Sequence, residues 1–410
     1  MNAQFILALS VLLIGTCICT EDNDYLTTVL KDVFGDLEEK DPAEFVVPIS
    51  PTLNTNATKP QTTPTSCQKG EKCVKEYLCK EGTVDEDGDV SIFNPRFLNE
   101  KNEPVCPFLE KCCSTGSITE DPIVRPRTVS LGCGNRNIDG VGYRIESPQI
   151  NESQFGEFPW MLAILRARDD TDTTREIYQC GGSLIHPEVA LTAAHCVFGR
   201  KATDFAVRAG EWETNTQNEL EPHQNRDVIE MVIHPKYNKN NLFNDVALLF
   251  LKSPFDLAQH INTVCLPPPG FVFDFSKCFA TGWGKDQFEN GKYQNILKKI
   301  ELPIVPSYVC QDNLRKTRLG NYFKLNPSFI CAGGERGKDT CEGDGGSPLV
   351  CPIETAENRF YQSGIVAWGI ECGKENVPGV YVNVALFREW IDEELEKKHL
   401  GVSEYVPLPR

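Results

Sequence analysis

Short apolar runs separated by turn-forming residues dominate the chain from residue 133 to the C-terminus. Glycine, proline and asparagine stand between runs that are only a few residues long. Such runs predict β-strands, and their number favours an all-β barrel or sandwich. Clear examples are residues 161–165, 190–194, 246–251 and 364–368.

A different pattern covers residues 386–395. Leu386, Trp390, Ile391 and Leu395 recur at the spacing of one helical face. This periodicity predicts a single terminal helix that packs back on the strands through these side chains.

The N-terminus opens with an apolar run over residues 5–15, followed by a stretch at 17–20 that suits signal-peptidase cleavage. We therefore expect residues 1–20 to be a secretory signal peptide. A membrane anchor is the alternative, but a spanning helix needs about 20 apolar residues and this run is shorter.

Residues 21–66 form an acidic stretch and then a linker. Apolar side chains recur at helical spacing over residues 21–43, which fits either a short partner-binding helix or a frayed segment. The marginal stability of isolated helices favours the frayed segment. Threonine, proline and asparagine dominate residues 48–65 and predict a disordered linker.

Composition narrows the class of protein further. Two of the 18 cysteines, Cys17 and Cys19, belong to the signal peptide, which leaves an even number for disulfides in an oxidising compartment. No pair of Cys-x-x-Cys motifs supports zinc. The length of 410 residues predicts two ordered units, and the net charge of -17 argues against nucleic acid or an anionic membrane as partner.

Six cysteines gather within residues 67–113 and predict a small disulfide-stapled domain. Spacing alone leaves 15 pairings open for six cysteines. Residues 114–139 follow as a second linker that contains Pro122, Pro126 and several arginines, which makes it a target for proteolysis.

Three short segments carry residue types used in acyl-transfer chemistry. His195 follows an apolar run and precedes Cys196, an arrangement that would fix an imidazole at a strand end. Asp245 opens another apolar run, where a carboxylate could orient that imidazole. A glycine-rich turn at residues 341–351 could direct backbone amides at an oxyanion.

Together these segments resemble the trypsin-like serine proteases over residues 140–397, with a tail at 398–410. The resemblance implies a double β-barrel with a C-terminal helix, hence a mainly β fold. It also implies five disulfides, which are Cys133–Cys265, Cys180–Cys196, Cys278–Cys351, Cys310–Cys331 and Cys341–Cys372. The matching motifs are Gly-Glu-Phe-Pro-Trp at 156–160, Cys-Gly-Gly-Ser-Leu-Ile at 180–185, Ala-Ala-His-Cys at 193–196, Thr-Gly-Trp-Gly at 281–284 and Pro-Gly-Val-Tyr at 378–381.

The chain departs from this family at the nucleophile. Where the family has Gly-Asp-Ser-Gly-Gly-Pro, residues 343–348 are Gly-Asp-Gly-Gly-Ser-Pro, so Gly345 replaces the serine. Losing the nucleophile costs on the order of 10^6 in turnover in a related enzyme. Ser347 lies two residues on, about 6–7 Å along an extended chain, too far to bond His195. We therefore expect no peptidase activity.

The start of the protease-like region also departs from the family. Active members expose an Ile-Val-Gly-Gly terminus that pairs with the aspartate before the nucleophile, whereas residues 143–148 read Tyr-Arg-Ile-Glu-Ser-Pro. Asp344 remains in the place of that aspartate. Candidate cleavage sites follow Arg125, Arg127, Arg136 and Arg144.

Two further sites follow from the resemblance. Asp339, Gly369 and Gly379 match the pocket that holds an arginine or lysine side chain, and this pocket either binds a basic side chain or is a relic. Glu211 and Glu221 lie in a loop that resembles the family's calcium loop. Calcium is thus a candidate ligand, and no cofactor is required.

The cysteine cluster at 67–113, ending in adjacent Cys112 and Cys113, resembles the clip domain of arthropod extracellular proteases. That family's plan implies the disulfides Cys67–Cys112, Cys73–Cys106 and Cys79–Cys113. A clip domain beside a protease-like domain with glycine for serine resembles the clip-domain serine protease homologs of the prophenoloxidase-activating factor 2, or masquerade-like, group.

This resemblance implies a secreted haemolymph protein that assists prophenoloxidase activation after cleavage. Its expected partners are prophenoloxidase or phenoloxidase and an active clip-domain protease, with oligomerisation after cleavage. A protein that binds microbial surfaces and an unorthodox protease are the alternatives. The sequons at Asn56 and Asn151 predict glycosylation.

Overall fold

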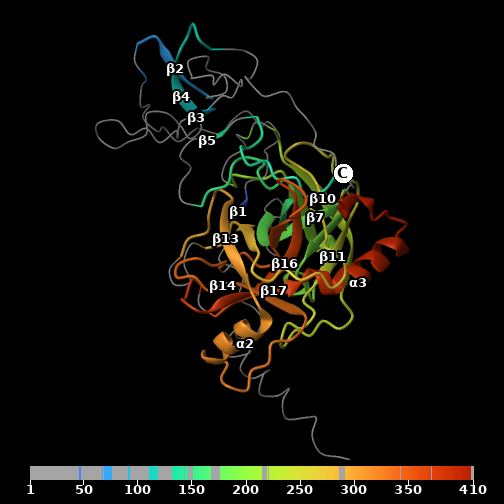
Figure 1. The fold of residues 1–410 in the computed structure, drawn as a ribbon. Coiled ribbons are helices and arrows are strands. Elements are labelled where there is room, and N and C mark those ends of the chain that lie inside the picture. The colour runs from blue at the N-terminus through green and yellow to red at the C-terminus, as the bar shows by residue number, and fades with distance from the viewer. Residues whose placement is uncertain are drawn as a thin grey trace, which may run out of the picture.

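The computed structural model of the chain describes residues 46–47, 67, 69–75, 91–92, 110–118, 132–142, 144–145, 151–167, 176–214, 219, 221–285, 291–341, 343–370 and 372–407. These residues form two β-barrels, short helices and two small two-stranded sheets (Figure 1). The predictions for the signal peptide, the acidic stretch at 21–43 and the linker at 48–65 lie outside the described residues.

The first barrel has six antiparallel strands in the order β7-β6-β9-β10-β11-β8, and pairing of β8 with β7 closes it. The two-residue strand β1 (Val46–Val47) adds to β7 outside this ring. Apolar side chains fill the interior; all five residues of β11 are buried, for example. The strands are β6 (Met161–Ala167), β7 (Glu176–His186), β8 (Val189–Thr192), β9 (Phe205–Ala209), β10 (Gln224–Ile233) and β11 (Ala247–Leu251).

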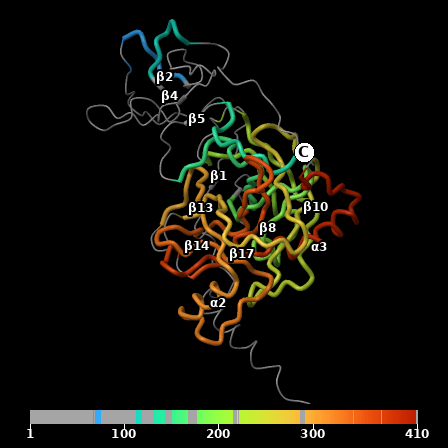
Figure 2. The backbone as a smooth tube through the Cα atoms, viewed as in Figure 1, coloured from blue at the N-terminus to red at the C-terminus, as the bar shows by residue number. Residues whose placement is uncertain are grey.

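The second barrel closes six antiparallel strands in the order β12-β13-β14-β17-β16-β15. In Figure 2 it is the orange and red part of the tube, beside the green and yellow first barrel. The predicted mainly β double-barrel fold is confirmed, and the four apolar runs fall on β6, β8, β11 and β16. The strands are β12 (Lys277–Gly282), β13 (Lys298–Val305), β14 (Phe329–Gly333), β15 (Pro348–Pro352), β16 (Phe360–Trp368) and β17 (Pro378–Asn383).

Among the described residues, helices are few and lie outside the barrels. The α-helices there are α2 (Ser307–Arg315) and the predicted terminal helix, α3 (Val384–Lys397); η3 (Ala202–Asp204) is a 3₁₀ turn before β9. No helix among the described residues is long and apolar enough to cross a bilayer.

The predicted buried face of α3 is partly wrong. Leu386 is 49% exposed, whereas Phe387, Ile391 and Leu395 are buried one turn apart. Ile391 and Leu395 are therefore buried as predicted, but Phe387 rather than Leu386 begins the buried row, because barrel packing leaves Leu386 exposed. The predicted tail also packs: the 3₁₀ turn η4 (Ser403–Tyr405) buries Tyr405, whose hydroxyl donates to Asp392.

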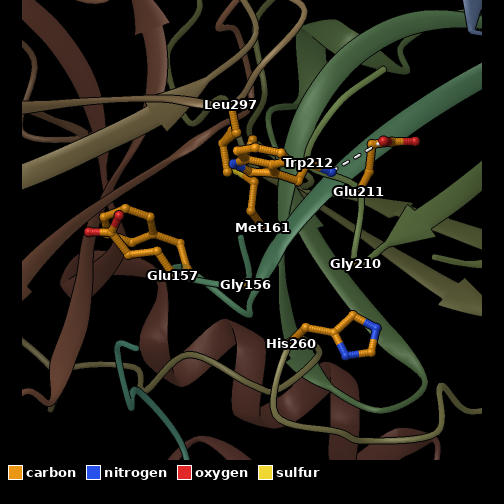
Figure 3. Close-up of a pocket in the computed structure, with 9 residues that line it drawn as sticks. Gly156, Glu157, Met161, Gly210, Glu211, Trp212, His260 and Leu297 are labelled. Carbon is orange, nitrogen blue, oxygen red and sulfur yellow. Dashed lines mark hydrogen bonds between the residues drawn. The ribbon is translucent and has the colours of Figure 1, made fainter. Parts of the chain in front are cut away.

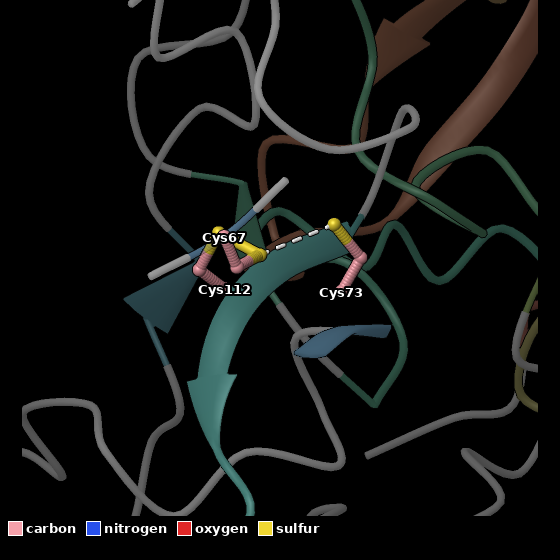
Figure 4. A group of neighbouring side chains, drawn as sticks. All are labelled: Cys67, Cys73 and Cys112. Atoms are coloured by element: carbon pink, nitrogen blue, oxygen red, sulfur yellow. Dashed lines mark hydrogen bonds between the residues drawn. A yellow bond between two sulfur atoms is a disulfide. The ribbon is translucent and has the colours of Figure 1, made fainter. Parts of the chain in front are cut away.

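The N-terminal cysteine cluster contains a short antiparallel pair, β2 (Glu71–Lys75) with β4 (Glu110–Ser114). A disulfide joins Cys67 to Cys112, and the Cys73 sulfur lies beside it (Figure 4). Cys73 and Cys113 each take part in a further disulfide. Their implied partners, Cys106 and Cys79, lie outside the described residues.

Part of the segment assigned to the second linker packs on the barrels. Cys133 is bonded to Cys265, and the backbone of Gly134 bonds that of Thr263. The Arg136 guanidinium lies 4.1 Å from the Phe279 ring and bonds the buried Glu157. Residues 132–139 therefore belong structurally to the protease-like domain, because a disulfide and a buried ion pair hold them there.

Candidate functional site

The pairing of β8 with β11 brings together the histidine and aspartate that the sequence singled out. His195 lies in the 3₁₀ turn η2 (Ala194–Cys196) just after β8, and Asp245 lies just before β11. Their strands pair so that Ala247 is opposite Thr192. Nδ1 of His195 lies 2.6 Å from Oδ2 of Asp245, and the backbone N–H of His195 donates to Oδ1 over 2.7 Å.

Asp245 orients the imidazole and favours its charged form. The carboxylate of Asp245 is fully buried, while the His195 side chain is 21% exposed. Burial acts to lower the pKa of His195, but the charge and hydrogen bond of Asp245 outweigh it and the pKa is raised. Nε2 remains directed at the position where an acyl-transfer enzyme has its nucleophile.

Gly345 occupies the position next to Nε2. A Cβ atom placed on Gly345 would lie 2.9 Å from Nε2 of His195. The carbonyl of Gly345 accepts the N–H of Gly181 on β7 over 2.9 Å, which fixes this loop against the first barrel. The imidazole therefore faces a residue that has no side chain.

Ser347 does not replace the missing hydroxyl. Its side chain is fully buried, and its Oγ makes no hydrogen bond to His195. The hydroxyl instead lies against β7, where a Cβ on Gly181 would be 1.9 Å from it. This contact explains why Gly181 has no side chain.

Asp344 is held by backbone amides. Oδ1 accepts the N–H of Gly284 over 2.8 Å, and Oδ2 accepts the N–H of Cys341 over 2.9 Å. Burial raises the pKa of Asp344 to about 6, although both hydrogen bonds oppose the change. The sequence identified Asp344 but not its donors, because backbone donors leave no residue signature.

Of the residues matched to the pocket, Asp339 and Gly379 lie side by side. Asp339 accepts N–H groups from Thr340 and Gly373 over 2.9 and 3.3 Å. Burial raises the pKa of Asp339 to about 7, and the charge of Asp344 adds to the shift. A Cβ on Gly379 would lie 2.8 Å from Oδ1 of Asp339, whereas a Cβ on Gly369 would meet nothing within 4 Å.

The turn after β9 brings two carboxylates together. Glu219, which the sequence analysis did not name, faces Glu211; burial and the charge of Glu211 raise the pKa of Glu219 to about 8. Two facing carboxylates fit a calcium ion, which takes oxygen ligands. Glu211 also pairs with Arg208, at 3.0 Å, so one cation is already present.

A small pocket lies beside this turn and apart from His195. Figure 3 shows Glu211, Trp212, Met161 and His260 among its lining residues, with Glu211 accepting the N–H of Trp212. Its lining side chains are mostly apolar, and His195, Asp245 and Gly345 are not among its lining residues.

The remaining predicted sites differ in exposure. Asn151 is exposed, as a glycosylated side chain must be, and Asn56 lies outside the described residues. The Arg136 side chain is only 10% exposed, which hides this cleavage candidate. Arg144 lies in β5 (Arg144–Ile145), which pairs with β3 (Ser91–Ile92). Arg125 and Arg127 lie outside the described residues.

All five disulfides that the resemblance implies for the protease-like region are present. Cys180–Cys196 lies directly beside His195. The others are Cys133–Cys265, Cys278–Cys351, Cys310–Cys331 and Cys341–Cys372.

The sequence matches two protein-family models. Residues 148–391 match the trypsin family, and residues 58–114 match the family described as serine protease clip domain PPAF-2. Both matches coincide with the regions where the sequence and the fold indicate a protease-like unit and a disulfide-rich unit.

Several curated relatives align with two thirds or more of the chain. Phenoloxidase-activating factor 2 of Galleria mellonella is 52% identical over 297 residues, which cover 70% of this chain and 97% of the relative. Inactive CLIP domain-containing serine protease A8 of Anopheles gambiae is 40% identical over 329 residues, 79% of this chain and 88% of the relative. Phenoloxidase-activating factor 1 of Holotrichia diomphalia is 32% identical over 302 residues, 68% of this chain and 79% of the relative.

Proposed function

Because this chain belongs to the trypsin family and also carries a clip domain, we propose that it is a serine protease homolog without peptidase activity that promotes prophenoloxidase activation in arthropod melanization. It acts after proteolytic processing, as a binding cofactor for an active clip-domain protease and for prophenoloxidase or phenoloxidase. The extracellular fluid of the haemolymph is the proposed location, which the disulfides fit.

One observation supports the proposed lack of peptidase activity: the oriented imidazole of His195 faces Gly345. A general base accelerates acyl transfer only when a nucleophile lies within hydrogen-bond reach. Glycine offers no attacking atom, and the hydroxyl of Ser347 is buried against Gly181. Relatives with names that begin "inactive" support the same conclusion.

The cofactor role draws support from the relatives and from the preserved cleft. Two of the relatives described above are named phenoloxidase-activating factors. The buried carboxylate of Asp339 and the unobstructed position at Gly369 match the family's pocket for a basic side chain, which supports this role. A cleft that binds without cleaving would hold a basic segment of a partner in place, which suits a scaffold.

The decisive experiment mixes purified prophenoloxidase with its activating protease, with and without the processed protein. Phenoloxidase activity is compared at equal zymogen cleavage, and the size of the complex is followed by light scattering. We expect a gain in activity only when the processed protein is present. Equal activity in both mixtures would contradict the cofactor role, and tight binding to microbial polysaccharide would then favour recognition of microbial surfaces.

A further inference from the structure

The short strand β1 covers part of the edge of β7. Val46 pairs with Ile177 and Val47 with Glu176, in antiparallel register. These two residues precede the clip domain in the sequence, yet in Figure 1 β1 lies with the barrels and apart from β2 and β4. A segment from outside the protease-like domain therefore extends its sheet by strand addition.

The covered edge leads into the cleft. Four residues beyond Ile177, Gly181 donates its N–H to the carbonyl of Gly345. Cys180, between them, is bonded to Cys196 beside His195. A strand advances about 3.4 Å per residue, so β1 lies about 14 Å along β7 from the Gly345 contact.

No disulfide joins the residues up to Cys113 to the barrels, so their covalent link to the barrels is the backbone. Every cysteine after residue 113 is bonded to another cysteine after residue 113. Cleavage between Cys113 and Cys133 would therefore sever the N-terminal fragment completely. Cleavage after Arg136 or Arg144 would leave the Cys133 segment attached through its bond to Cys265, and the fragment with it.

Two of the four candidate cleavage sites are obstructed in the folded chain. The Arg136 side chain is enclosed by Glu157 and Phe279. Arg144 is paired in register with Ser91, and a protease must free the extended backbone of its target before cleaving it. Arg125 and Arg127, which lie between Cys113 and Cys133 in the sequence, are the remaining candidates.

We propose that β1 is an internal latch, a strand of the N-terminal region that occupies the edge of β7 at Glu176–Ile177 until processing releases it. The intact chain holds β1 near β7 at an effective concentration on the order of millimolar. Cleavage between Cys113 and Cys133 removes this advantage, and a two-residue strand cannot stay bound without it. The freed edge then offers unpaired backbone groups on the strand that contacts Gly345.

Hydrogen exchange on the full chain tests the latch directly. The variant Val46→Pro/Val47→Pro removes both N–H groups of β1, and we expect the amides of residues 176–178 to exchange about tenfold faster or more. The matched control is Thr62→Pro/Thr63→Pro, beside the natural Pro64, and should leave that exchange unchanged. Unaltered protection of β12 to β17 verifies that each variant is folded.

A second form of the protein tests release. A site-specific protease sequence is placed at residues 121–127 of the full chain, and exchange is measured before and after cleavage. We expect residues 176–178 to lose protection and the N-terminal fragment to separate by size exclusion. If residues 176–178 stay protected after cleavage and the N-terminal fragment stays bound, the proposed release of β1 is wrong. Unchanged exchange in Val46→Pro/Val47→Pro would overturn the latch itself.

One further outcome distinguishes where the strand comes from. Protection at residues 176–178 that vanishes on dilution, together with a dimer mass, would assign the strand to a second copy and overturn the internal latch. Neither readout involves prophenoloxidase, so failure of the latch and failure of the proposed cofactor role are separate results.

Discussion

The carboxylate of Asp245 lies 2.6 Å from Nδ1 of His195, yet Nε2 of the same imidazole faces Gly345, which has no side chain. Two members of a triad are thus held in working geometry while the third is missing. Selection for peptide hydrolysis does not explain this pair, but the pair also fixes η2 and β11 relative to each other, because Asp245 accepts the backbone N–H of His195. The pair of His195 and Asp245 therefore also stabilises the fold.

Active-site labelling tests the missing nucleophile. We expect the processed protein not to react with a fluorophosphonate probe, because covalent labelling requires an activated serine. The variant Gly345→Ser should gain slow labelling, since its Cβ would lie 2.9 Å from Nε2 of His195 and the imidazole must shift to admit it. Labelling of the unmodified protein at this site would contradict the proposal.

The matched control for this experiment is the double variant Gly345→Ser/His195→Ala. It keeps the new hydroxyl and removes the base, so labelling should fall to background. Equal labelling of both variants would mean that the hydroxyl reacts without help from His195.

The pH dependence of stability should reveal the pairing of His195 with Asp245. In the folded protein the pKa of His195 is raised, because the charge and hydrogen bond of Asp245 outweigh the opposing effect of burial. The resulting stabilisation is fully present below the unfolded pKa of about 6.5 and is lost as pH rises through the folded value. Asp245→Asn should therefore destabilise the protein more at pH 5 than at pH 9, as measured by chemical denaturation. An equal cost at both pH values would contradict this linkage.

Ionisation of Asp339 should destabilise the folded protein at alkaline pH. Burial raises the pKa of Asp339 to about 7 from 3.8, so ionisation is disfavoured in the folded protein. Relative to low pH, stability is lost as pH rises from the unfolded pKa through about 7. We expect Asp339→Asn to raise the free energy of unfolding by up to about 4 kcal/mol at pH 8 and little at pH 4.

The control for Asp339 is Asp227→Asn, because Asp227 is an exposed carboxylate in a surface ion pair with Lys252. Its substitution should change stability by no more than about 1 kcal/mol at either pH. If the two variants behaved alike, the buried carboxylate would not be a source of strain.

Calcium binding can be tested through thermal stability. Burial and the charge of Glu211 raise the pKa of Glu219 to about 8, and a bound cation would relieve this repulsion. At about 100 times its dissociation constant, calcium should stabilise the protein by about 2.7 kcal/mol at pH 8. Glu219→Gln should abolish the effect. If only Glu221→Gln abolishes the effect, the second carboxylate is Glu221, as the sequence analysis predicted. If calcium stabilises neither the unmodified protein nor any variant, there is no calcium site here.

How far the sequence predicted the molecule depended on the kind of signal. Strands such as β11 were predictable because every residue is buried, which leaves an uninterrupted apolar run. The helix at the C-terminus was predictable, but not its buried face, because Leu386 and Phe387 fit helical spacing equally well until packing exposes the first. Local periodicity does not say which of two adjacent apolar residues faces the core.

The functional site was likewise predictable only in part. His195, Asp245 and Gly345 follow from motifs, because their chemistry depends on side-chain type. Glu219 did not, since its approach to Glu211 depends on how the turn after β9 folds. The disulfide Cys133–Cys265 was expected from the resemblance, but the burial of Arg136 was not, because an arginine between Pro126 and Tyr143 looks like a linker residue in sequence.

Electrophoresis of the naturally processed protein locates the cleavage. If processing occurs between Cys113 and Cys133, the N-terminal fragment should separate without reductant, because no disulfide joins it to the barrels. If it occurs after Arg144, separation should require reduction of Cys133–Cys265. We expect the first result, since Arg144 is paired with Ser91 and Arg136 is enclosed. Arg125→Ala/Arg127→Ala should block processing, and Arg144→Ala should not. A fragment released only by reductant would place processing at or beyond Arg136 and leave β1 tethered beside β7.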